Sequence, residues 1–319
     1  MCYQPRTMPR FEFTIDDAMQ GRRLDKVVID ALGHRVGRSG AKELFAAGAV
    51  RVEGKRVSKG DVAQSGQVVT VELPEEVGER PAAEVDAPLD VRLEREDLVV
   101  VCKPAGQPTA PLRPGEQGTL AGALLGHYPE MDGVGRTPRE PGILHRLDTG
   151  TSGLVLAART PDAFQAALAA LHAGEIRKRY LLVCAAEGLA ETGEIDIPLA
   201  PHPKDHRRVL ACAHERDQHR NNPRPASTKY RLVKVVGDLA LVEASASKAQ
   251  RHQIRAHFAA IGHPLEGDAL YGGSTERIGR QALHASYLAW SGTASIAGFE
   301  VEAALPEDLR ALIEAAERG

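Results

Sequence analysis

The stretch of sequence that decides the fold reads His145-Arg146-Leu147-Asp148-Thr149-Gly150-Thr151-Ser152-Gly153-Leu154-Val155-Leu156. The apolar run from Leu154 to Ala157 predicts a buried strand. The small residues before it predict a tight connection, in which glycine permits unusual backbone angles and close approach of a ligand. We therefore expect Asp148 at the edge of a sheet, in a loop that displays its carboxylate. For an isolated Asp-Thr-Gly, the alternative is an ordinary turn whose side chains cap backbone amides.

The same loop contains Asp-Thr-Gly-Thr, which matches the active-site triplet of aspartic peptidases. Such peptidases need two carboxylates that share a proton, supplied by a second triplet or by a homodimer. The sequence contains no second Asp-Thr-Gly or Asp-Ser-Gly, so an aspartic peptidase is a remote alternative. A serine hydrolase is weaker still, because the segment around Ser152 lacks the G-x-S-x-G spacing of a nucleophile elbow. Ser152 is predicted to be structural.

Further blocks of sequence lie on both sides of this loop. Upstream, residues 99–106 predict a strand that enters a Pro/Gly loop carrying Lys103. Downstream, residues 176–183 predict a strand with a basic entrance and one aromatic residue, Tyr180. The remaining blocks are Arg251-His252-Gln253-Ile254-Arg255-Ala256-His257, Gly262-His263-Pro264-Leu265-Glu266-Gly267-Asp268, Tyr271-Gly272 and Arg280-Gln281-Ala282-Leu283-His284-Ala285. Together, from about Arg22 to Leu309, these blocks resemble the RluA/RluD-type RNA pseudouridine synthases.

The resemblance implies an α+β fold with a mixed, largely antiparallel sheet and a catalytic cleft across it. It also implies that Asp148, Tyr180 and Arg255 are catalytic, and that RNA contacts come from Arg146, His145 and Lys103. Lys103 is expected to face the RNA or the site, and the alternative for His145 is a satisfied loop histidine. From the residues alone, Tyr180 is a half-buried strand residue and Arg255 a solvated or phosphate-binding one.

The implied reaction explains these residue types. Conversion of uridine to pseudouridine breaks the bond from ribose C1′ to uracil N1 and joins C5 to the same carbon, so no redox, nucleotide or metal cofactor is required. A carboxylate that attacks or stabilises the ribose must be ionised, although burial beside an RNA base disfavours the ionised form. The guanidinium of Arg255 is expected to offset this through a bidentate fork on Asp148. The target base must also leave its position in the RNA stack. Arg146 is a candidate to occupy the position that the base leaves, and Tyr180 is a candidate to cover the extruded base.

Two departures from the family pattern stand out. Ala249-Gln250 replaces the usual Gly-Arg, a loss for which Lys248 and Arg251 can compensate, and Trp290 is followed by Ser291-Gly292 rather than by His-Pro. The alternative function is therefore a non-catalytic RNA-binding factor in ribosome assembly.

The formal net charge of -3 conceals a segregation of charge. Residues 21–60 contain ten Lys/Arg and four Asp/Glu, whereas residues 61–100 contain three Arg and eleven Asp/Glu. The apolar stripe from Leu24 to Leu32 predicts a helix. Ser39 is a candidate cap of a second helix, which ends near Gly48. Residues 50–57 predict a pair of strands with a turn at Gly54. This order resembles the S-four (alpha-L) RNA-binding module. Its candidate RNA contacts are Arg22, Arg23, Lys26, Arg38, Lys42, Arg51, Lys55 and Arg56; a merely solvated basic surface is the alternative.

The chain is accordingly divided into an N-terminal extension (1–20), an S-four-type domain (21–73), an acidic linker (74–90) and a catalytic domain (91–319). In the catalytic domain, Thr160-Pro161 and Gly174 predict the two ends of a helix.

Metal binding is not expected. His252 and His257 are five positions apart, which is about 140° around a helix, so they do not share a face. The four cysteines form no C-x-x-C pair and are expected to be reduced thiols in a cytoplasmic protein. The sequence contains no apolar segment long enough to predict a membrane span. The expected partner is RNA, most specifically large-subunit ribosomal RNA, bound by a monomer.

Overall fold

The computed structural model describes residues 10–32, 38–72, 80–113 and 115–318. The chain divides into two compact units: the first comprises Met1–Pro81, Leu112–Gly115 and Arg136–Glu140, and the second comprises the rest. Each unit is described by itself.

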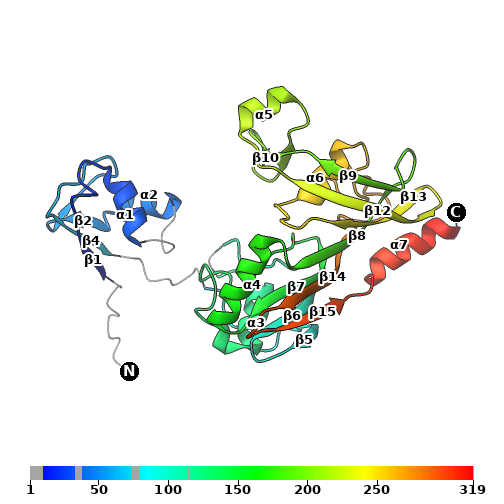
Figure 1. Cartoon of the computed structure of the whole chain (residues 1–319), viewed down its shortest axis with the longest axis horizontal. Helices are drawn as coiled ribbons and strands as arrows, with labels where there is room; N and C mark the ends of the chain where they lie inside the picture. The colour runs from blue at the N-terminus through cyan, green and yellow to red at the C-terminus, as the bar shows by residue number, and fades with distance from the viewer. Residues whose placement is uncertain (1–9, 33–37, 73–79, 114, 319) are drawn as a thin grey trace. The chain divides into compact units, whose positions relative to one another are not determined.

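The smaller unit is an antiparallel sheet packed against two helices (Figure 1). Its strands have the order β1-β4-β2-β3, and the core is formed by apolar residues of both helices and of the sheet. The elements are β1 (Arg10–Thr14), α1 (Leu24–Leu32), α2 (Arg38–Ala47), β2 (Val50–Val52), β3 (Lys55–Arg56) and β4 (Val68–Glu72).

Most of the predicted local structure of this unit is confirmed. Leu24, Val27, Val28 and Leu32 are the buried face of α1, and β2 and β3 pair around a turn at Gly54. Two predictions are wrong. Ser39 lies inside α2 and is not its cap. The first domain also begins earlier than residue 21, because β1, which lies in the predicted N-terminal extension of residues 1–20, pairs with β4 over its full length.

The larger unit is built on a nine-stranded sheet of order β5-β6-β7-β14-β8-β13-β12-β9, with β15 paired to β14. Only the pair β7–β14 is parallel among the described strands of this sheet. The strands are β5 (Val91–Glu94), β6 (Leu98–Lys103), β7 (Ser152–Ala158), β8 (Arg177–Ala185), β9 (Thr192–Asp196), β12 (Ser227–Val236), β13 (Leu239–Ser245), β14 (Leu283–Gly292) and β15 (Ala297–Glu302).

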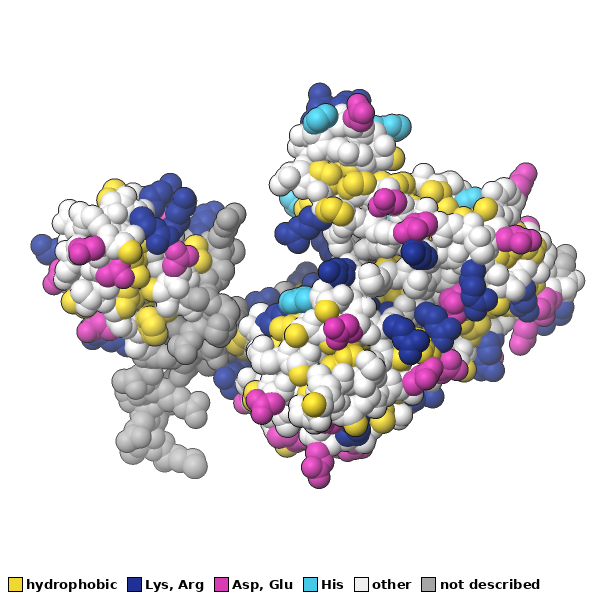
Figure 2. Space-filling view, in the orientation of Figure 1, with side chains coloured by type: hydrophobic (Ala, Val, Ile, Leu, Met, Phe, Trp, Pro, Cys, Tyr) yellow, Lys and Arg dark blue, Asp and Glu magenta, His cyan; other side chains and the backbone are white. Residues whose placement is uncertain are grey.

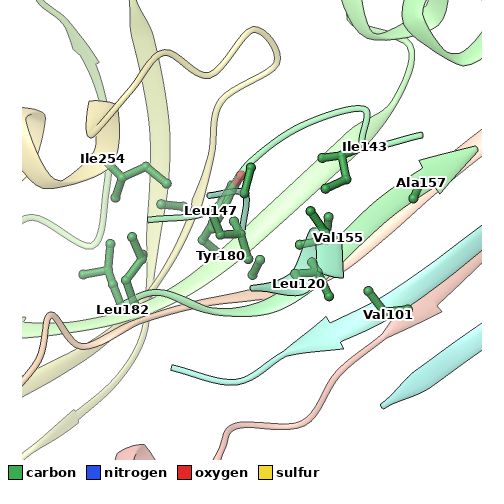
Figure 3. Close-up of a cluster of buried hydrophobic side chains, with 14 of the residues drawn as sticks. Val101, Leu120, Ile143, Leu147, Val155, Ala157, Tyr180, Leu182 and Ile254 are labelled. Atoms are coloured by element: carbon green, nitrogen blue, oxygen red, sulfur yellow. The ribbon is translucent and has the colours of Figure 1, made fainter. Parts of the chain in front are cut away.

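Helices cover both faces of this sheet. On one face, α3 (Leu120–His127), the short 3-10 helix η2 (Pro129–Met131) and α6 (Gln253–Ala260) share a core with Val155 and Leu182 (Figure 3). On the other, α4 (Pro161–Ala173) packs on β6 and β7, while α7 (Glu307–Arg318) packs on β12 and β13. The predicted ends of α4 are confirmed, because Thr160 caps its first turn and Gly174 ends it with a φ of 83°.

A small excursion lies between β9 and β12. It consists of the hairpin β10 (Leu199–Pro201) and β11 (Val209–Ala211), followed by α5 (Glu215–Asn221), and projects from the sheet at the top of Figure 1. The section from residue 199 to residue 225 is called the hairpin segment below.

The predicted acidic linker is shorter than expected. Residues 73–79 lie outside the described part, but residues 82–90 belong to the larger unit. There the Glu84 carboxylate accepts hydrogen bonds from the Gly118 amide at 2.9 and 3.0 Å, and its own amide donates to the Gly122 carbonyl at 3.0 Å. A side chain at Gly126 would approach the Glu84 carbonyl oxygen to 2.3 Å, so glycine at this position allows the contact. Local composition did not reveal this packing.

No helix in the described residues has the length and apolar character needed to cross a membrane. Within the same residues, no group of three or more His, Cys, Asp or Glu side chains could hold a metal ion. Cys102, Cys184 and Cys212 are free thiols, and Cys2 lies outside the described residues.

Candidate active site

The loop that carries Asp148 is fixed by hydrogen bonds to its own backbone and to neighbouring loops. The Asp148 carbonyl accepts from the Thr151 amide at 2.9 Å, which closes the turn. On the preceding side, the Thr109 hydroxyl donates to the Leu147 carbonyl at 2.7 Å. After the turn, Gly153 has a φ of 117°, and a Cβ there would lie 2.3 Å from the carbonyl oxygen of Ala285 on β14. The predicted tight connection with an unusual glycine backbone angle is confirmed, and the close approach at Gly153 is that of the β14 backbone.

Lys103 lies beneath this loop and is completely buried. Its ammonium group donates to the carbonyls of Pro104 at 2.8 Å, Gln107 at 2.8 Å and Thr149 at 3.3 Å. Burial lowers the pKa of Lys103 to about 8, so it remains mostly protonated at neutral pH. Of the two positions expected for Lys103, facing the RNA or facing the site, the structure shows the second, with no surface of the side chain open to a direct RNA contact. Its three N–H groups match three carbonyls and tie the 104–107 loop to the Asp148 loop.

We expect Lys103→Met to loosen this connection. The variant leaves three partly buried carbonyls without their donor, so the free energy of unfolding should fall by roughly 1–3 kcal/mol and product formation should slow. RNA affinity should stay at the wild-type value, because the ammonium is not accessible. Urea unfolding and filter binding measure the two quantities. Lys234→Met is the matched control, since Lys234 is exposed and pairs with Glu317 at the surface. Weakened RNA binding with unchanged stability would contradict the assignment.

Asp148 and Arg255 meet across the face of the sheet that carries α3 and α6. The carboxylate Oδ2 of Asp148 accepts a hydrogen bond from Nη1 of Arg255 at 2.8 Å. The Asp148 side chain is 26% exposed and the Arg255 side chain 7%, so the carboxylate remains open to a ligand while the guanidinium is enclosed. Figure 3 shows Ile254, the neighbour of Arg255, close to Leu147 of the Asp148 loop.

The bidentate fork of the Arg255 guanidinium binds Asp268, whereas the sequence predicts that it binds Asp148. Its Nε and Nη2 donate to Oδ2 and Oδ1 of Asp268 at 2.7 and 2.8 Å, while only Nη1 is directed to Asp148. The Asp268 side chain is 1% exposed. Burial alone would lower the pKa of Arg255, but Asp268 and Asp148 more than offset that effect and raise it. The guanidinium is therefore a permanent cation, oriented by Asp268 and presented to Asp148.

His252 and Tyr271 complete the surroundings of Asp148. Nε2 of His252 lies 3.6 Å from Oδ1 of Asp148, and the Tyr271 ring lies 5.1 Å from the guanidinium carbon of Arg255. His252 precedes α6 with a φ of 55°, a left-handed conformation that is uncommon outside glycine. The sequence motifs contained His252, Asp268 and Tyr271, but nothing in their spacing indicated that they gather around one carboxylate.

Tyr180 lies on β8 with its ring among apolar side chains, beside Leu147 and Leu182 (Figure 3). It is 7% exposed, and burial together with the negative charge of Asp148 raises its pKa to about 12. The phenol is therefore neutral at physiological pH. Its position on the same sheet face as Asp148 is the one expected for a residue that covers a bound base.

His145 and Arg146, the two remaining predicted RNA contacts near the site, differ in their exposure to solvent. His145 accepts a hydrogen bond at Nε2 from the Leu156 amide at 3.1 Å, and burial, with a smaller effect of Lys178, lowers its pKa to about 3. It is a neutral residue that joins the loop to β7, which agrees with the alternative of a satisfied loop histidine. Arg146 is exposed next to the Asp148 loop, as a residue that meets RNA must be.

The predicted contacts of the smaller unit are largely at its surface. Exposed side chains are those of Arg22, Arg23, Lys26, Lys42, Lys55 and Arg56, whereas Arg51 is half-buried and the side chain of Arg38 lies outside the described part. Arg22 pairs with Asp30, and Arg23 pairs with Asp25 at 2.8 Å. These six cations are far along the chain from Asp148.

The fold is shared with solved pseudouridylate synthase structures. Human RNA Pseudouridylate Synthase Domain Containing 1 covers 73% of this chain and 96% of its own, with a TM-score of 0.54 and 21% identity. The corresponding human Domain Containing 4 protein covers 72% and 93%, with a TM-score of 0.54 and 20% identity. These likenesses concern the fold, and they confirm the predicted α+β class.

The sequence relationships reach further. The model of the family described as RNA pseudouridylate synthase matches residues 97–260. Ribosomal large subunit pseudouridine synthase D of Xanthomonas campestris is 32% identical over 94% of this chain and 91% of its own, and that of Yersinia pestis is 32% identical over 95% and 93%. The chain belongs to the RNA pseudouridylate synthase family, whose members are isomerases.

Proposed function

We propose that the protein isomerises specific uridines of large-subunit ribosomal RNA to pseudouridine, with Asp148, Arg255 and Tyr180 as its catalytic residues. The observation that carries the proposal is the contact between the partly open Asp148 carboxylate and the buried, permanently charged Arg255. The ribosomal target is supported by relatives named for the large subunit, which align over more than nine-tenths of both chains. The protein acts as a monomer in the cytoplasm, where its RNA partner is located.

The geometry suits the reaction in three respects. One oxygen of Asp148 is held by the cationic Arg255, while the exposed part of the side chain can reach a ribose. The neutral Tyr180 ring can stack on an extruded uracil, and its hydroxyl is available for proton transfer. Arg146, exposed beside the loop, can take the place of the base in the RNA stack.

The departure at Ala249-Gln250 does not disturb this arrangement. Gln250 donates from its side chain to the Pro225 carbonyl at 2.7 Å, and Arg251 donates to the His206 carbonyl at 2.9 Å. Both residues thus support the hairpin segment, and the contacts of Asp148 are made by other residues. This observation favours a working enzyme over a non-catalytic assembly factor.

Chemical mapping of ribosomal RNA tests the proposal. A strain lacking the gene should lose one or more pseudouridines of the large subunit, and the wild-type gene should restore them. The Asp148→Asn gene should not restore them. Unchanged modification in the deletion strain would support the assembly factor instead.

We also propose that the smaller unit is the S-four-type RNA-binding module. It has two helices against a short antiparallel sheet, and exposed Lys42, Lys55 and Arg56 supply cations for phosphate binding. A large structured substrate offers phosphates far from the target uridine, which such a module can bind.

Removal of residues 1–81 should therefore weaken binding to ribosomal RNA and flatten the slope of log affinity against log salt. Each lost phosphate contact should reduce the slope by roughly 0.7–0.9. The larger unit has its own cores, so it should remain folded and should modify a short target stem-loop at high concentration. Salt titrations of both proteins measure this, with Lys42→Gln/Lys55→Gln as a milder variant. Equal slopes for all three proteins would mean that the cations of the smaller unit are only solvated.

A further inference from the structure

A chain of polar contacts leads from the Asp148 carboxylate to the hairpin segment. Nε2 of His252 lies 3.6 Å from Oδ1 of Asp148, and Nδ1 of His252 lies 3.1 Å from the Tyr271 hydroxyl. The Tyr271 oxygen in turn accepts a hydrogen bond from the Val209 amide on β11 at 2.9 Å. The rings of His252 and Tyr271 meet edge to face with centroids 5.8 Å apart. Both side chains are therefore packed in one orientation between the carboxylate and β11.

The hydrogen-bond donors decide which form of His252 fits. The Val209 amide donates to the Tyr271 oxygen, and the Tyr271 hydroxyl has two acceptors within reach: Nδ1 of His252 at 3.1 Å and the Val209 carbonyl at 3.4 Å. The shorter contact favours donation to Nδ1. A neutral imidazole that accepts at Nδ1 carries its hydrogen on Nε2. Nε2 is the nitrogen that lies 3.6 Å from Oδ1 of Asp148, the oxygen that Arg255 does not bind. The opposite tautomer would place a lone pair against the ionised carboxylate.

Charged groups of both signs surround His252. Burial lowers its pKa most strongly, Asp148 and Asp268 raise it, and Arg255 and Arg251 lower it. The net direction is downward, so the imidazole is neutral at physiological pH. The tyrosine hydroxyl is the neighbour that selects the hydrogen on Nε2.

The far end of this chain lies in a basic segment. Figure 2 shows Lys, Arg and His side chains on the lobe that carries α5. This hairpin segment contains Lys204, Arg207, Arg208, Arg216, Arg220 and Arg224 against Asp205, Glu215 and Asp217. Its loop carbonyls at residues 206 and 207 also accept hydrogen bonds from Arg251, the residue next to His252. A polyanion that binds the segment therefore acts directly on the residues that hold His252.

We propose that His252 and Tyr271 are positioning residues that orient Oδ1 of Asp148 and make turnover depend on how the hairpin segment is seated, with RNA phosphates as the ligand that seats it. This inference rests on the proposed function, because it assigns Asp148 to the reaction. It adds two residues that act through Asp148 and names the element that controls them.

Tyr271→Phe is the smallest change that tests the chain of contacts from Asp148 through His252 to Tyr271, which is called the relay below. The ring contacts with Arg255 and His252 remain, and only the hydroxyl is lost. Nδ1 of His252 then becomes free to bind a proton, so the pKa of His252 should rise from the value to which burial lowers it. An imidazolium would form a full ion pair with Asp148 and make the carboxylate less reactive. The single-turnover rate should therefore fall by roughly 10- to 100-fold at pH 6 and recover toward pH 8, with RNA affinity within a few-fold of wild type.

A second substitution separates positioning from simple packing. His252→Asn keeps a residue type that tolerates the left-handed conformation, but it removes the imidazole. In this background, Tyr271→Phe should change neither the rate nor its pH profile, because the two residues act as one unit. Tyr230→Phe is the matched control: its ring packs against Phe258 of α6 at 5.4 Å, and it should behave as wild type.

The outcomes are distinct. A Tyr271→Phe enzyme with the wild-type rate and profile would overturn the relay, as would a rate loss that is equal at every pH and additive with His252→Asn. If the wild-type protein forms no pseudouridine at all, the proposed function fails and the relay fails with it. If wild type is active, Asp148→Asn is inactive and Tyr271→Phe is normal, only the relay fails.

Discussion

Asp148→Asn is expected to reduce pseudouridine formation by at least about a thousandfold. The amide cannot act as an ionised nucleophile or base, yet it has nearly the same volume and retains an oxygen to accept the hydrogen bond that Arg255 now gives to Asp148 at 2.8 Å. The loop should keep its conformation, because its fixing bonds come from Thr109, Thr151 and Lys103. RNA affinity should change by no more than a few-fold, since it is spread over many phosphate contacts.

Single-turnover assays with a stem-loop containing the target uridine measure this effect, and binding assays run in parallel measure affinity. Asp162→Asn is a matched control, because Asp162 is exposed in the first turn of α4 on the opposite face of the sheet. It should keep the wild-type rate. Product formed by the Asn variant at a rate near wild type would mean that another group performs the chemistry.

Arg255→Ala is expected to remove both activity and stability. Its guanidinium satisfies the Asp268 carboxylate, which is 1% exposed, at 2.7 and 2.8 Å, and loss of that partner leaves a buried charge uncompensated. The free energy of unfolding should fall by about 3–5 kcal/mol. Arg255→Lys keeps the charge but cannot bind two carboxylates through a planar fork, so it should recover only part of either property.

The double variant Arg255→Met/Asp268→Leu separates the two roles. Replacing both members of a buried ion pair by apolar side chains is often neutral for stability, so the double variant should regain most of the lost unfolding free energy. It should remain inactive, because Asp148 still lacks its cation. Urea unfolding and single-turnover rates for the two variants provide the comparison. Near-normal turnover in the double variant would show that Asp148 needs no help from Arg255.

The local parts of the fold could be predicted because their signals are local. The buried strand β7 follows from an apolar run, and the limits of α4 follow from Thr160 and Gly174. The identity of Asp148 as the central carboxylate came from the small residues around it and from family resemblance. Its partner, 107 positions away in sequence, came from resemblance alone, since no periodicity reports a contact over that distance.

The errors share a physical cause. Lysine is rarely buried, so the enclosure of Lys103 by three carbonyls ran against the ordinary expectation for its residue type. The fork of Arg255 was assigned to the functional carboxylate because the sequence does not show that Asp268 is buried beside it. Strand β1 exists because β4 pairs with it, and five residues carry too little pattern to indicate a partner 58 positions away.

The place of β14 in the larger sheet affects when the active site can form during synthesis of the chain. This strand, residues 283–292, lies between β7 and β8 and joins the half of the sheet next to Asp148 to the half that carries Tyr180. Until those residues leave the ribosome, the described strands of the two halves have no neighbour in common to pair with. Contacts between segments so distant in sequence form slowly, so the catalytic centre is among the last parts to assemble. A nascent chain can therefore complete the smaller unit long before the active site of the larger unit is assembled.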